Sequence, residues 1–209
     1  MSAGSKTKPV AALKIGRPRA FDRDTALLAA MRTFWTQGYE GTSMQDLVDA
    51  MGVNKPSLYS TFGCKEEIFR EAVALYDRTE GRATSQSLGE AKTSREAVEK
   101  MLRSNARAYA VEAGPRGCMI VLSSLLGAPE NESVRAFLAA NRSDGETMLR
   151  NRLAQGIVEG DLPASADVDQ LAAFYTTVLE GLSIQARDEA SVEKLNMIID
   201  AAMLAWPAG

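Results

Sequence analysis

The chain has 209 residues, of which 45% are hydrophobic and 24% are charged, and it contains no histidine. This composition is typical of an ordinary globular protein with room for one sizeable core and a small satellite domain. Because histidine is the commonest general base and zinc ligand, its absence disfavours enzymatic catalysis, and we expect no catalytic residue, no metal and no cofactor.

Local features exclude other broad classes of protein. No apolar run approaches the roughly 18 residues that a membrane span needs, and the basic N-terminus has no apolar signal-peptide core. We therefore expect a cytoplasmic protein with no membrane partner. The two cysteines, Cys64 and Cys118, are too few and too far apart in the sequence to indicate a disulfide framework.

The net charge of −3 is unevenly distributed along the chain. Residues 1–63 carry eight Lys or Arg and five acidic residues, which gives +3 and leaves −6 for the remainder. A basic N-terminal third beside an acidic remainder indicates that only the first part approaches a polyanion.

Residues 1–20 contain five basic and no acidic residues together with Ser, Gly and Pro, and we expect them to form a flexible basic arm. Arg17 and Arg19 lie on either side of Pro18, so two guanidinium groups sit on an extended backbone that is narrow enough for a DNA minor groove. The alternative is a tail that only increases solubility.

A helix is predicted next, capped by Asp22 and ended by Gly38. Its positions Leu27, Leu28, Met31, Phe34 and Trp35 form one apolar stripe.

Two short helices joined by a tight turn are predicted between residues 42 and 62. Thr42 or Ser43 caps the first helix, and Gly52 supplies the turn. Asn54 caps the second, whose first turn tolerates Pro56 because a missing N–H costs little there. The positions expected to face inward are Met44, Leu47, Val48, Met51, Leu58 and Phe62.

The outward positions of the second short helix have the chemistry of a DNA reader. Lys55 and Lys65 offer cations, Ser57 a small hydroxyl near base edges, and Tyr59 a hydroxyl for phosphate. Thr42, at a helix N-terminus, adds N–H and hydroxyl donors for phosphate. The alternative is that the helix pair only completes a small α-domain, but the charge asymmetry favours DNA binding.

The rest of the chain is predicted to form further helices. A fourth helix is expected over residues 65–82, another from residue 94, and a long one over 132–159. The nearly apolar segment 118–126 is expected to be buried on most sides. Two last helices carry apolar stripes that begin at Val168 and Val192. No alternating pattern of any length occurs, so we predict no sheet.

The N-terminal part of the chain resembles a known family. The stretch DTALLAAMRTFWTQGYEGTSMQDLVDAMGVNKPSLYSTFGCKEEIFREAVALY is similar to the DNA-binding domain of the TetR family of bacterial transcriptional regulators. The similarity covers residues from about Phe21 to Tyr76, and Arg116–Cys118 is also similar to one subgroup. Its specific positions are Gly38-Tyr39, Thr42, Gly52-Val53, Leu58-Tyr59, Phe62 and Lys65-Glu66-Glu67.

This resemblance implies an all-α homodimer in which each subunit reads half of a near-palindromic operator with its helix-turn-helix. It implies an N-terminal three-helix DNA-binding domain plus a larger C-terminal helical domain for ligand binding and dimerisation (about nine helices). The expected boundaries are 1–20 for the arm, 21–66 for the DNA-binding domain and 67–209 for the remainder. The candidate DNA contacts are Arg17, Arg19, Thr42, Ser43, Lys55, Pro56, Ser57, Tyr59, Thr61 and Lys65.

Two positions depart from the family pattern. Thr61 stands where the family usually has Tyr or His for a phosphate contact. Cys64 replaces the Ser, Asn or Asp that usually caps the fourth helix. An N-cap thiol beside Lys65 could sense oxidants, although a tolerated substitution is the simpler interpretation, and Cys118 is expected to be inert core.

The family resemblance also implies a small-molecule effector whose binding shifts the DNA-binding domains out of register. Asn105, Asn141 and Arg152 interrupt apolar stripes, and a buried polar group needs a partner, which either a ligand or neighbouring helices provide. If Arg152 faces the cavity, an anionic effector is expected. The candidate lining residues are Met101, Asn105, Tyr109, Met119, Asn141, Met148, Arg152 and Tyr175.

The last two helices, over residues of about 165–206, have wide apolar faces, with Phe174 beside the stripe and Gly181 allowing close approach. We predict that they form a two-fold four-helix interface with a second subunit, unless these faces serve only the monomer's own core. The leading hypothesis is a homodimeric repressor released from its operator by a small molecule. The alternative keeps the DNA-binding domain and makes the C-terminal domain a protein-interaction module without a ligand.

Overall fold

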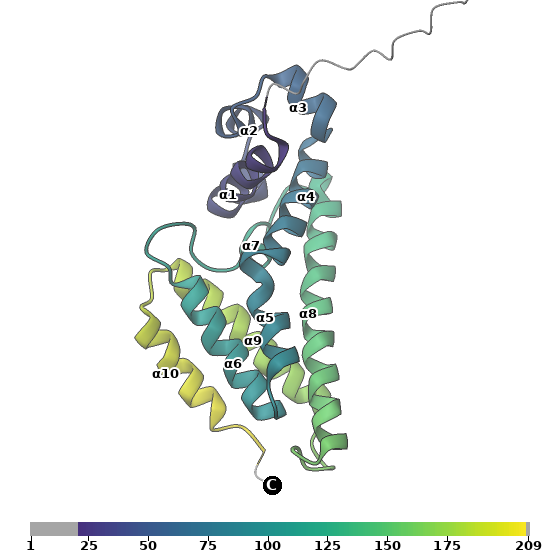
Figure 1. The fold of residues 1–209 in the computed structure, drawn as a ribbon, viewed down its shortest axis with the longest axis vertical. Coiled ribbons are helices and arrows are strands. Elements are labelled where there is room, and N and C mark those ends of the chain that lie inside the picture. The colour runs from purple at the N-terminus through teal and green to yellow at the C-terminus, as the bar shows by residue number, and fades with distance from the viewer. Residues whose placement is uncertain (1–20, 208–209) are drawn as a thin grey trace, which may run out of the picture.

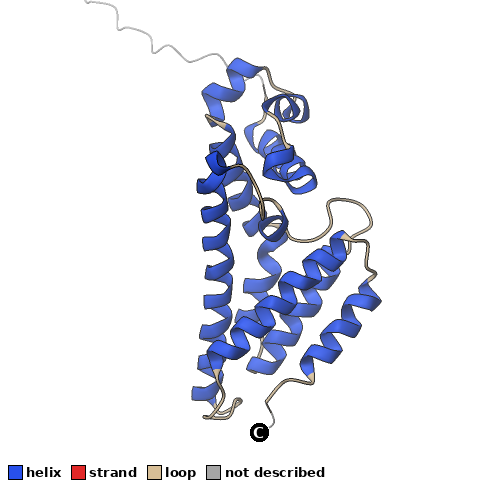
Figure 2. Ribbon diagram, turned by 180° about the vertical axis from the view of Figure 1, so that it is seen from behind, coloured by secondary structure: helices blue, strands red, loops and turns tan. Residues whose placement is uncertain are grey.

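The computed structural model describes residues 21–207. Within that range the protein is all-α, with ten α-helices, two short 3₁₀ helices and no strand. The predicted basic arm, including Arg17 and Arg19, lies outside the described residues. The two views of the fold are Figure 1 and, from behind, Figure 2.

The first three helices and the start of the fourth form a compact head at one end of the molecule (Figure 1). Its elements are α1 (Arg23–Gly41), α2 (Met44–Met51), α3 (Lys55–Phe62) and α4 (Lys65–Arg78). Asp22 caps α1 as predicted, because its Oδ1 accepts a hydrogen bond of 2.7 Å from the Thr25 N–H. Phe34 packs edge-on against Phe69 with 5.0 Å between ring centroids, which fixes α1 on α4.

Gly38 interrupts α1 as the sequence predicted, although the helix resumes for its last residues. Its φ of 74° lies in the left-handed region, and a Cβ there would stand 3.0 Å from the Ser123 carbonyl oxygen. Both restrictions favour glycine, since the chain from the second half of the molecule approaches α1 closely at this point.

The fourth helix is shorter than predicted. It ends at Arg78, and the chain continues through a 3₁₀ turn, η1 (Glu80–Arg82), into the unpredicted helix α5 (Ala83–Glu90). Thr79 has non-helical φ and ψ of −113° and −85°, and its hydroxyl donates to the Leu75 carbonyl at 2.8 Å. This side-chain bond satisfies a carbonyl at the helix end and so allows the chain to break there.

The remaining helices form the larger part of the molecule. They are α6 (Ser94–Tyr109), α7 (Met119–Leu122), α8 (Glu132–Glu159), α9 (Val168–Arg187) and α10 (Val192–Met203), with a 3₁₀ turn η2 (Pro129–Asn131) before α8. The bounds of α8 are those predicted from the sequence, and Gly160 ends it in the left-handed conformation. Helix α8 begins beside α4 and runs to the end of the molecule opposite the head, α9 and α6 pack against it, and α10 packs against α6 and α9 (Figures 1 and 2).

The segment 118–126 is mostly buried, so the prediction that it is buried on most sides was wrong only for its last two residues. Cys118, Met119 and Val121 are buried, but Leu125 and Leu126 are 53% and 87% exposed. The helical turn stops at Leu122, Ser123 and Ser124 remain buried, and the chain leaves the core at Leu125.

Helix α4 belongs to both parts of the molecule. Its Phe69 packs in the head, and its Tyr76, seven residues later, is buried between Trp35 of α1, with 4.9 Å between ring centroids, and Cys118 of the helical domain. A single helix therefore connects the two parts rigidly, and the domain boundary at residue 66 stays a prediction.

Candidate DNA interface and ligand pocket

Helix α3 presents a polar face to solvent because its local sequence fixes its orientation. The Asn54 side chain accepts a 2.9 Å hydrogen bond from the Ser57 N–H and so caps the helix start. Leu58 and Phe62 are buried, whereas Tyr59 on the opposite side is 49% exposed. The residues of α3 that remain at least partly exposed are Lys55, Pro56, Ser57, Tyr59, Ser60 and Thr61.

Helix α2 precedes α3 and begins with a reciprocal pair of capping hydrogen bonds. Ser43, not Thr42, is its N-cap, and the Ser43 hydroxyl accepts from the Asp46 N–H at 3.1 Å while the Asp46 carboxylate accepts from the Ser43 N–H at 2.7 Å. The Ser43 hydroxyl, followed by its backbone N–H, lowers the pKa of Asp46, so the reciprocal pair is stabilised with Asp46 charged. Gly52 then turns the chain toward α3 in the left-handed conformation.

Thr42 is placed differently from the prediction. Its residue is 1% exposed, and its hydroxyl donates to the Gly38 carbonyl at 2.7 Å. Its backbone N–H points back to the Tyr39 carbonyl at 3.3 Å. Both donors that were expected to bind phosphate are therefore used inside the head, where they hold the end of α1.

Lys65 lies at the start of α4, beside the head core. Its Nζ stands 4.2 Å from the centroid of the Tyr39 ring, which is a cation–π contact between the ammonium group and the ring. Burial lowers the pKa of Lys65, against the opposing influence of Glu40 and Asp46. The ammonium group is thus positioned by the ring of Tyr39.

Cys64 is exposed at the N-cap of α4. Its backbone N–H donates to the Glu67 carboxylate at 2.7 Å, and this bond lowers the pKa of Glu67. Whether the thiol senses oxidants stays a hypothesis.

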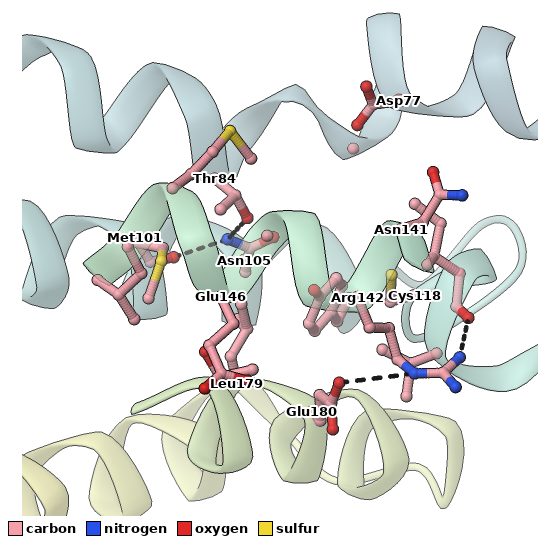
Figure 3. A pocket seen from close by; sticks show the side chains of 18 of the residues that line it. Asp77, Thr84, Met101, Asn105, Cys118, Asn141, Arg142, Glu146, Leu179 and Glu180 are labelled. Carbon is pink, nitrogen blue, oxygen red and sulfur yellow. Dashed lines mark hydrogen bonds and ion pairs between the residues drawn. The ribbon is translucent and has the colours of Figure 1, made fainter. Parts of the chain in front are cut away.

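A cavity of about 110 Å³ lies in the helical domain, between α4, α5, α6, α7, α8 and α9. Its wall is mainly apolar, and Figure 3 shows the side chains that surround it. Five of the predicted ligand residues line it, namely Met101, Asn105, Tyr109, Asn141 and Met148.

Three predicted ligand residues do not line the cavity. Met119 is fully buried in packing, and Tyr175 is buried with its ring against Phe174 and Trp206. Arg152 donates to the Ser94 hydroxyl at 3.0 Å and forms an ion pair of 3.3 Å with Glu159. The buried guanidinium joins α8 to α6 and does not face the cavity, so the condition under which an anionic effector was expected is not met.

Several residues that line the cavity were missed in the sequence. Arg142, Glu146 and Glu180 are charged residues that interrupt no predicted apolar stripe, and Thr84 lies on a helix that was not predicted. Cys118 was expected to be inert core, and it does line the cavity, next to the phenols of Tyr76 and Tyr109. Burial, followed by the neighbouring Cys118, raises the pKa of Tyr109 well above its usual value, so this phenol stays neutral. The further missed lining residues are Asp77, Gly81, Ile120, Val121, Gly145, Leu149, Thr176 and Leu179.

Residues 117–123, named here the connecting segment, join this cavity to the head. Three of its residues, Cys118, Ile120 and Val121, line the cavity. Its two ends contact α1, because the Trp35 indole donates to the Gly117 carbonyl at 3.0 Å and the Tyr39 N–H donates to the Ser123 carbonyl at 2.8 Å. The cavity wall and the helix that supports the DNA-binding head therefore share one short piece of chain.

The connecting segment is also held to α8 and α9. The Ser183 hydroxyl accepts from the Cys118 N–H at 2.8 Å, and Arg142 donates to the Ile120 carbonyl at 3.2 Å. A Cβ on Gly117 would stand 2.6 Å from a Leu122 methyl and 2.7 Å from the Ser183 carbonyl oxygen, and its φ is 77°. Only glycine fits here, which explains one residue of the Arg116–Cys118 motif.

Helices α9 and α10 carry an apolar surface that this chain leaves uncovered. Phe174, Ile184, Met197 and Leu204 are exposed, with Leu204 at 87%. Gly181 has open space where a Cβ would stand. The predicted dimer helices thus have both the apolar side chains and the small residue that close helix packing uses.

Metal binding and membrane insertion find no support in residues 21–207. No group of three or more His, Cys, Asp or Glu side chains there is arranged to hold a metal ion. No helix in this range is long and apolar enough to cross a membrane.

Comparison with known proteins gives matches over both parts of the chain. The family profile described as "Bacterial regulatory proteins, tetR family" matches residues 26–72, and "Tetracyclin repressor-like, C-terminal domain" matches residues 95–202. The chain is 35% identical to the HTH-type transcriptional repressor ComR of Escherichia coli (strain K12), over 92% of each chain. It is 30% identical to the HTH-type transcriptional repressor BdcR of the same organism, over 86% of each chain.

A solved structure extends this similarity to a DNA complex. A cysteine mutant of the TetR family transcriptional regulator CifR, in complex with 26-base-pair double-strand operator DNA, is 47% identical. The two structures superpose with a TM-score of 0.89, over 91% of this chain and 100% of that chain.

Proposed function

The chain belongs to the TetR family of bacterial transcriptional regulators, and from this premise we propose that it is a homodimeric repressor that a small molecule releases from a near-palindromic operator. The observation that carries the proposal is the capped helix α3, whose polar side faces solvent while Leu58 and Phe62 anchor it. In this role the protein is a regulator and not an enzyme. Its work on DNA places it in the cytoplasm.

The proposed DNA contacts divide by chemistry. Lys55, Pro56, Ser57 and Tyr59 enter the major groove with α3, where Lys55 and Ser57 reach base edges and Tyr59 a phosphate. Lys65 adds a second phosphate contact from the start of α4.

Further proposed contacts flank this helix pair. The Ser43 hydroxyl, at the N-terminus of α2, is proposed as a phosphate contact. Thr61 is proposed as a weaker backbone contact, and Arg17 and Arg19 as minor-groove contacts.

The exposed apolar face of α9 and α10 is the proposed dimer interface. A two-fold axis would place the same face of a second copy on it, with Gly181 allowing the backbones to approach. The two heads would then present their α3 helices to two half-sites of one operator.

The proposed release mechanism uses the connecting segment. A ligand that fills the cavity presses on Cys118, Ile120 and Val121, and the hydrogen bonds at Gly117 and Ser123 transmit the displacement to α1. The ligand acts by binding the released state better than the DNA-bound state, and a coupling of about 1–3 kcal/mol is typical.

The alternative in which the C-terminal domain only binds another protein is less well supported. It would require a filled core, whereas this domain holds a mainly apolar cavity next to the segment that contacts the head. The exposed apolar face that it would use is the one that the second subunit needs.

Operator binding is the direct test. A duplex selected from a random library, and its scrambled version, are titrated by gel shift with the wild type and with Ser57→Ala and Tyr59→Ala variants. We expect Tyr59→Ala to weaken binding to every sequence, because a phosphate contact is lost, and Ser57→Ala to change the preferred sequence. Failure to select any duplex would overturn the proposed function.

The dimer interface has a separate test. Ile184→Glu places a charge on the apolar face of α9, and we expect it to produce monomers in sedimentation equilibrium. Val158→Glu is the matched control, because Val158 is also exposed but lies at the end of α8. Equal effects of the two variants would contradict the assignment.

A further inference from the structure

The polar groups around the cavity are mostly acceptors. Three carboxylates, those of Asp77, Glu146 and Glu180, line it, and Arg142 is the one charged donor among its lining residues (Figure 3). A cavity with this balance favours a ligand that brings donors and positive charge.

Arg142 is already committed to protein partners. Its Nε stands 3.9 Å from a Glu180 carboxylate oxygen, and its Nη1 donates to the Ile120 carbonyl at 3.2 Å. The side-chain carboxylates of Asp77, which is exposed, and Glu146, which is half-buried, form no hydrogen bond or ion pair with any of residues 21–207. Two carboxylates at the cavity therefore remain without a counter-charge.

Asn105 gives an independent indication deeper in the wall. The residue is 2% exposed, and its amide nitrogen donates both to the Thr84 hydroxyl at 3.0 Å and to the Met101 carbonyl at 2.9 Å. These two bonds use both amide protons and fix the amide orientation. The Oδ1 atom accepts no hydrogen bond from the described residues, so a ligand in the cavity that donates one can use it.

The rest of the wall suits a flat apolar body. The rings of Tyr76 and Tyr109 and the sulfur atoms of Met101 and Met148 line the cavity, and aromatic faces attract cations. A volume of about 110 Å³ is that of roughly three to four waters at about 30 Å³ each, and is of the same order as the about 150 Å³ apolar cavity that holds benzene. A molecule built on one aromatic ring has that size.

We propose that the effector of this pocket is a small organic cation, with a flat apolar body and a protonated nitrogen that donates hydrogen bonds. The body lies between the tyrosine and methionine side chains. The nitrogen faces the Asn105 oxygen or the carboxylates of Asp77 and Glu146. The inference rests on the proposed function, since it names the chemistry of the ligand that releases the operator.

Three probes of nearly one shape test the charge preference. They are benzylamine, which is protonated at pH 7, neutral benzyl alcohol and anionic benzoate, each titrated into the full-length protein by calorimetry. We expect the amine to bind about tenfold or more tightly than the alcohol, and the benzoate to bind most weakly. Equal or tighter binding of the alcohol or the benzoate overturns the proposal, as does no binding of the amine below about 1 mM.

A pair of neighbouring acids on α8 localises the effect. Glu146→Gln removes a lining carboxylate, whereas Asp144→Asn removes an exposed carboxylate two residues earlier that does not line the cavity. We expect Glu146→Gln to reduce the preference for the amine about threefold, and Asp144→Asn to leave it unchanged. Equal behaviour of the two variants overturns the assignment to this cavity.

Operator release separates this inference from the proposed function. Release of the selected duplex by the alcohol but not by the amine would overturn the proposal of a cationic effector. It would not contradict the proposal of a ligand-released repressor. Tight amine binding by a protein that binds no operator duplex would support the cationic ligand and overturn the ligand-released repressor. Release by the amine, lost in parallel with its affinity in Glu146→Gln, supports both.

Discussion

The DNA-binding head and the effector cavity are held together by different kinds of contact. In the head, each helix start is closed by a partner three residues away, as in Ser43 with Asp46, Asn54 with Ser57, and Cys64 with Glu67. The cavity is assembled from six helices, and its polar groups pair across long stretches of chain, as Asn105 does with Thr84 and Arg142 with Glu180.

This difference accounts for what each region can do. Local caps leave the head few ways to rearrange, so it presents a fixed surface to DNA. The cavity keeps unpaired acceptors and a half-exposed Met148, so a ligand can still change its contacts. The connecting segment lies where the rigid region meets the adaptable one.

The largest expected effect tests the rigidity of the head. Leu58 is fully buried under α3, and Leu58→Ala should lower the free energy of unfolding by about 2–5 kcal/mol, since a large buried side chain leaves a cavity. Urea denaturation measures the change. Leu126→Ala, at an 87% exposed position, should stay within about 0.5 kcal/mol. A loss at Leu58 as small as that of the control would show that α3 is not anchored as described.

The next effect tests whether the head binds DNA through contacts of its cations with phosphates. Lys65→Ala should weaken binding to selected and scrambled duplexes alike, and should reduce the slope of log K against log salt by about one, because one phosphate contact is lost. Fluorescence anisotropy at several salt concentrations measures both. Lys92→Ala, between α5 and α6 and distant in sequence from the head, should change neither. An unchanged slope for Lys65→Ala would remove this residue from the interface.

A smaller effect tests the junction between the two regions. Trp35→Phe keeps an aromatic ring but removes the pyrrole ring and its N–H, which donates to Gly117 in a bond worth about 1 kcal/mol. Operator release by the tightest of the three benzyl probes should then need a several-fold higher concentration, while calorimetric affinity for the probe changes little. Trp206→Phe is the control, because Trp206 lies beyond α10. If both variants release the operator like the wild type, the connecting segment does not transmit the signal through this bond.

The smallest effect concerns the contact of α4 with the N-terminal end of α8. Hydrogen bonds from Arg70, followed by Ser133, lower the pKa of Glu66. A folded-state pKa below the unfolded value gives stability that is present above the unfolded pKa and is lost as pH falls through the folded pKa. Glu66 is solvent-accessible, so screening keeps this contribution small.

Thermal unfolding between pH 6 and pH 3 checks this expectation. The melting temperature of the Glu66→Gln variant should decrease less on acidification than that of the wild type, because the variant has no carboxylate at position 66 to protonate. Glu130→Gln, an exposed residue in η2, should follow the wild type. A Glu66→Gln curve that coincides with the wild type would show that this pair does not link the two helices energetically.

Local sequence signals predicted most of the head correctly. Asp22, Ser43 or Thr42, Gly52 and Asn54 were identified as caps and turns, and the apolar spacing placed Leu58 and Phe62 inside. The same kind of signal located both ends of α8. It failed after Arg78, where Thr79 ends the helix by a bond to its own preceding turn, a choice that periodicity does not record.

The cavity was only half predicted, for a physical reason. Asn105 and Arg152 both interrupt apolar stripes, and the sequence cannot distinguish them, because each needs a partner. In the fold Arg152 finds Ser94 and Glu159, whereas Asn105 keeps one atom facing the cavity. Arg142, Glu146 and Glu180 look like solvated charges until α8 and α9 bring them together.

The sequence by itself determined the all-α fold, the family and the capped helix pair with its outward polar face, since caps, turns and helical stripes are short-range features. The tertiary structure decided which polar side chains surround the cavity, that Thr42 turns inward, and that residues 117–123 contact α1. Those outcomes depend on which distant groups meet when the helices pack, and no local spacing carries that information.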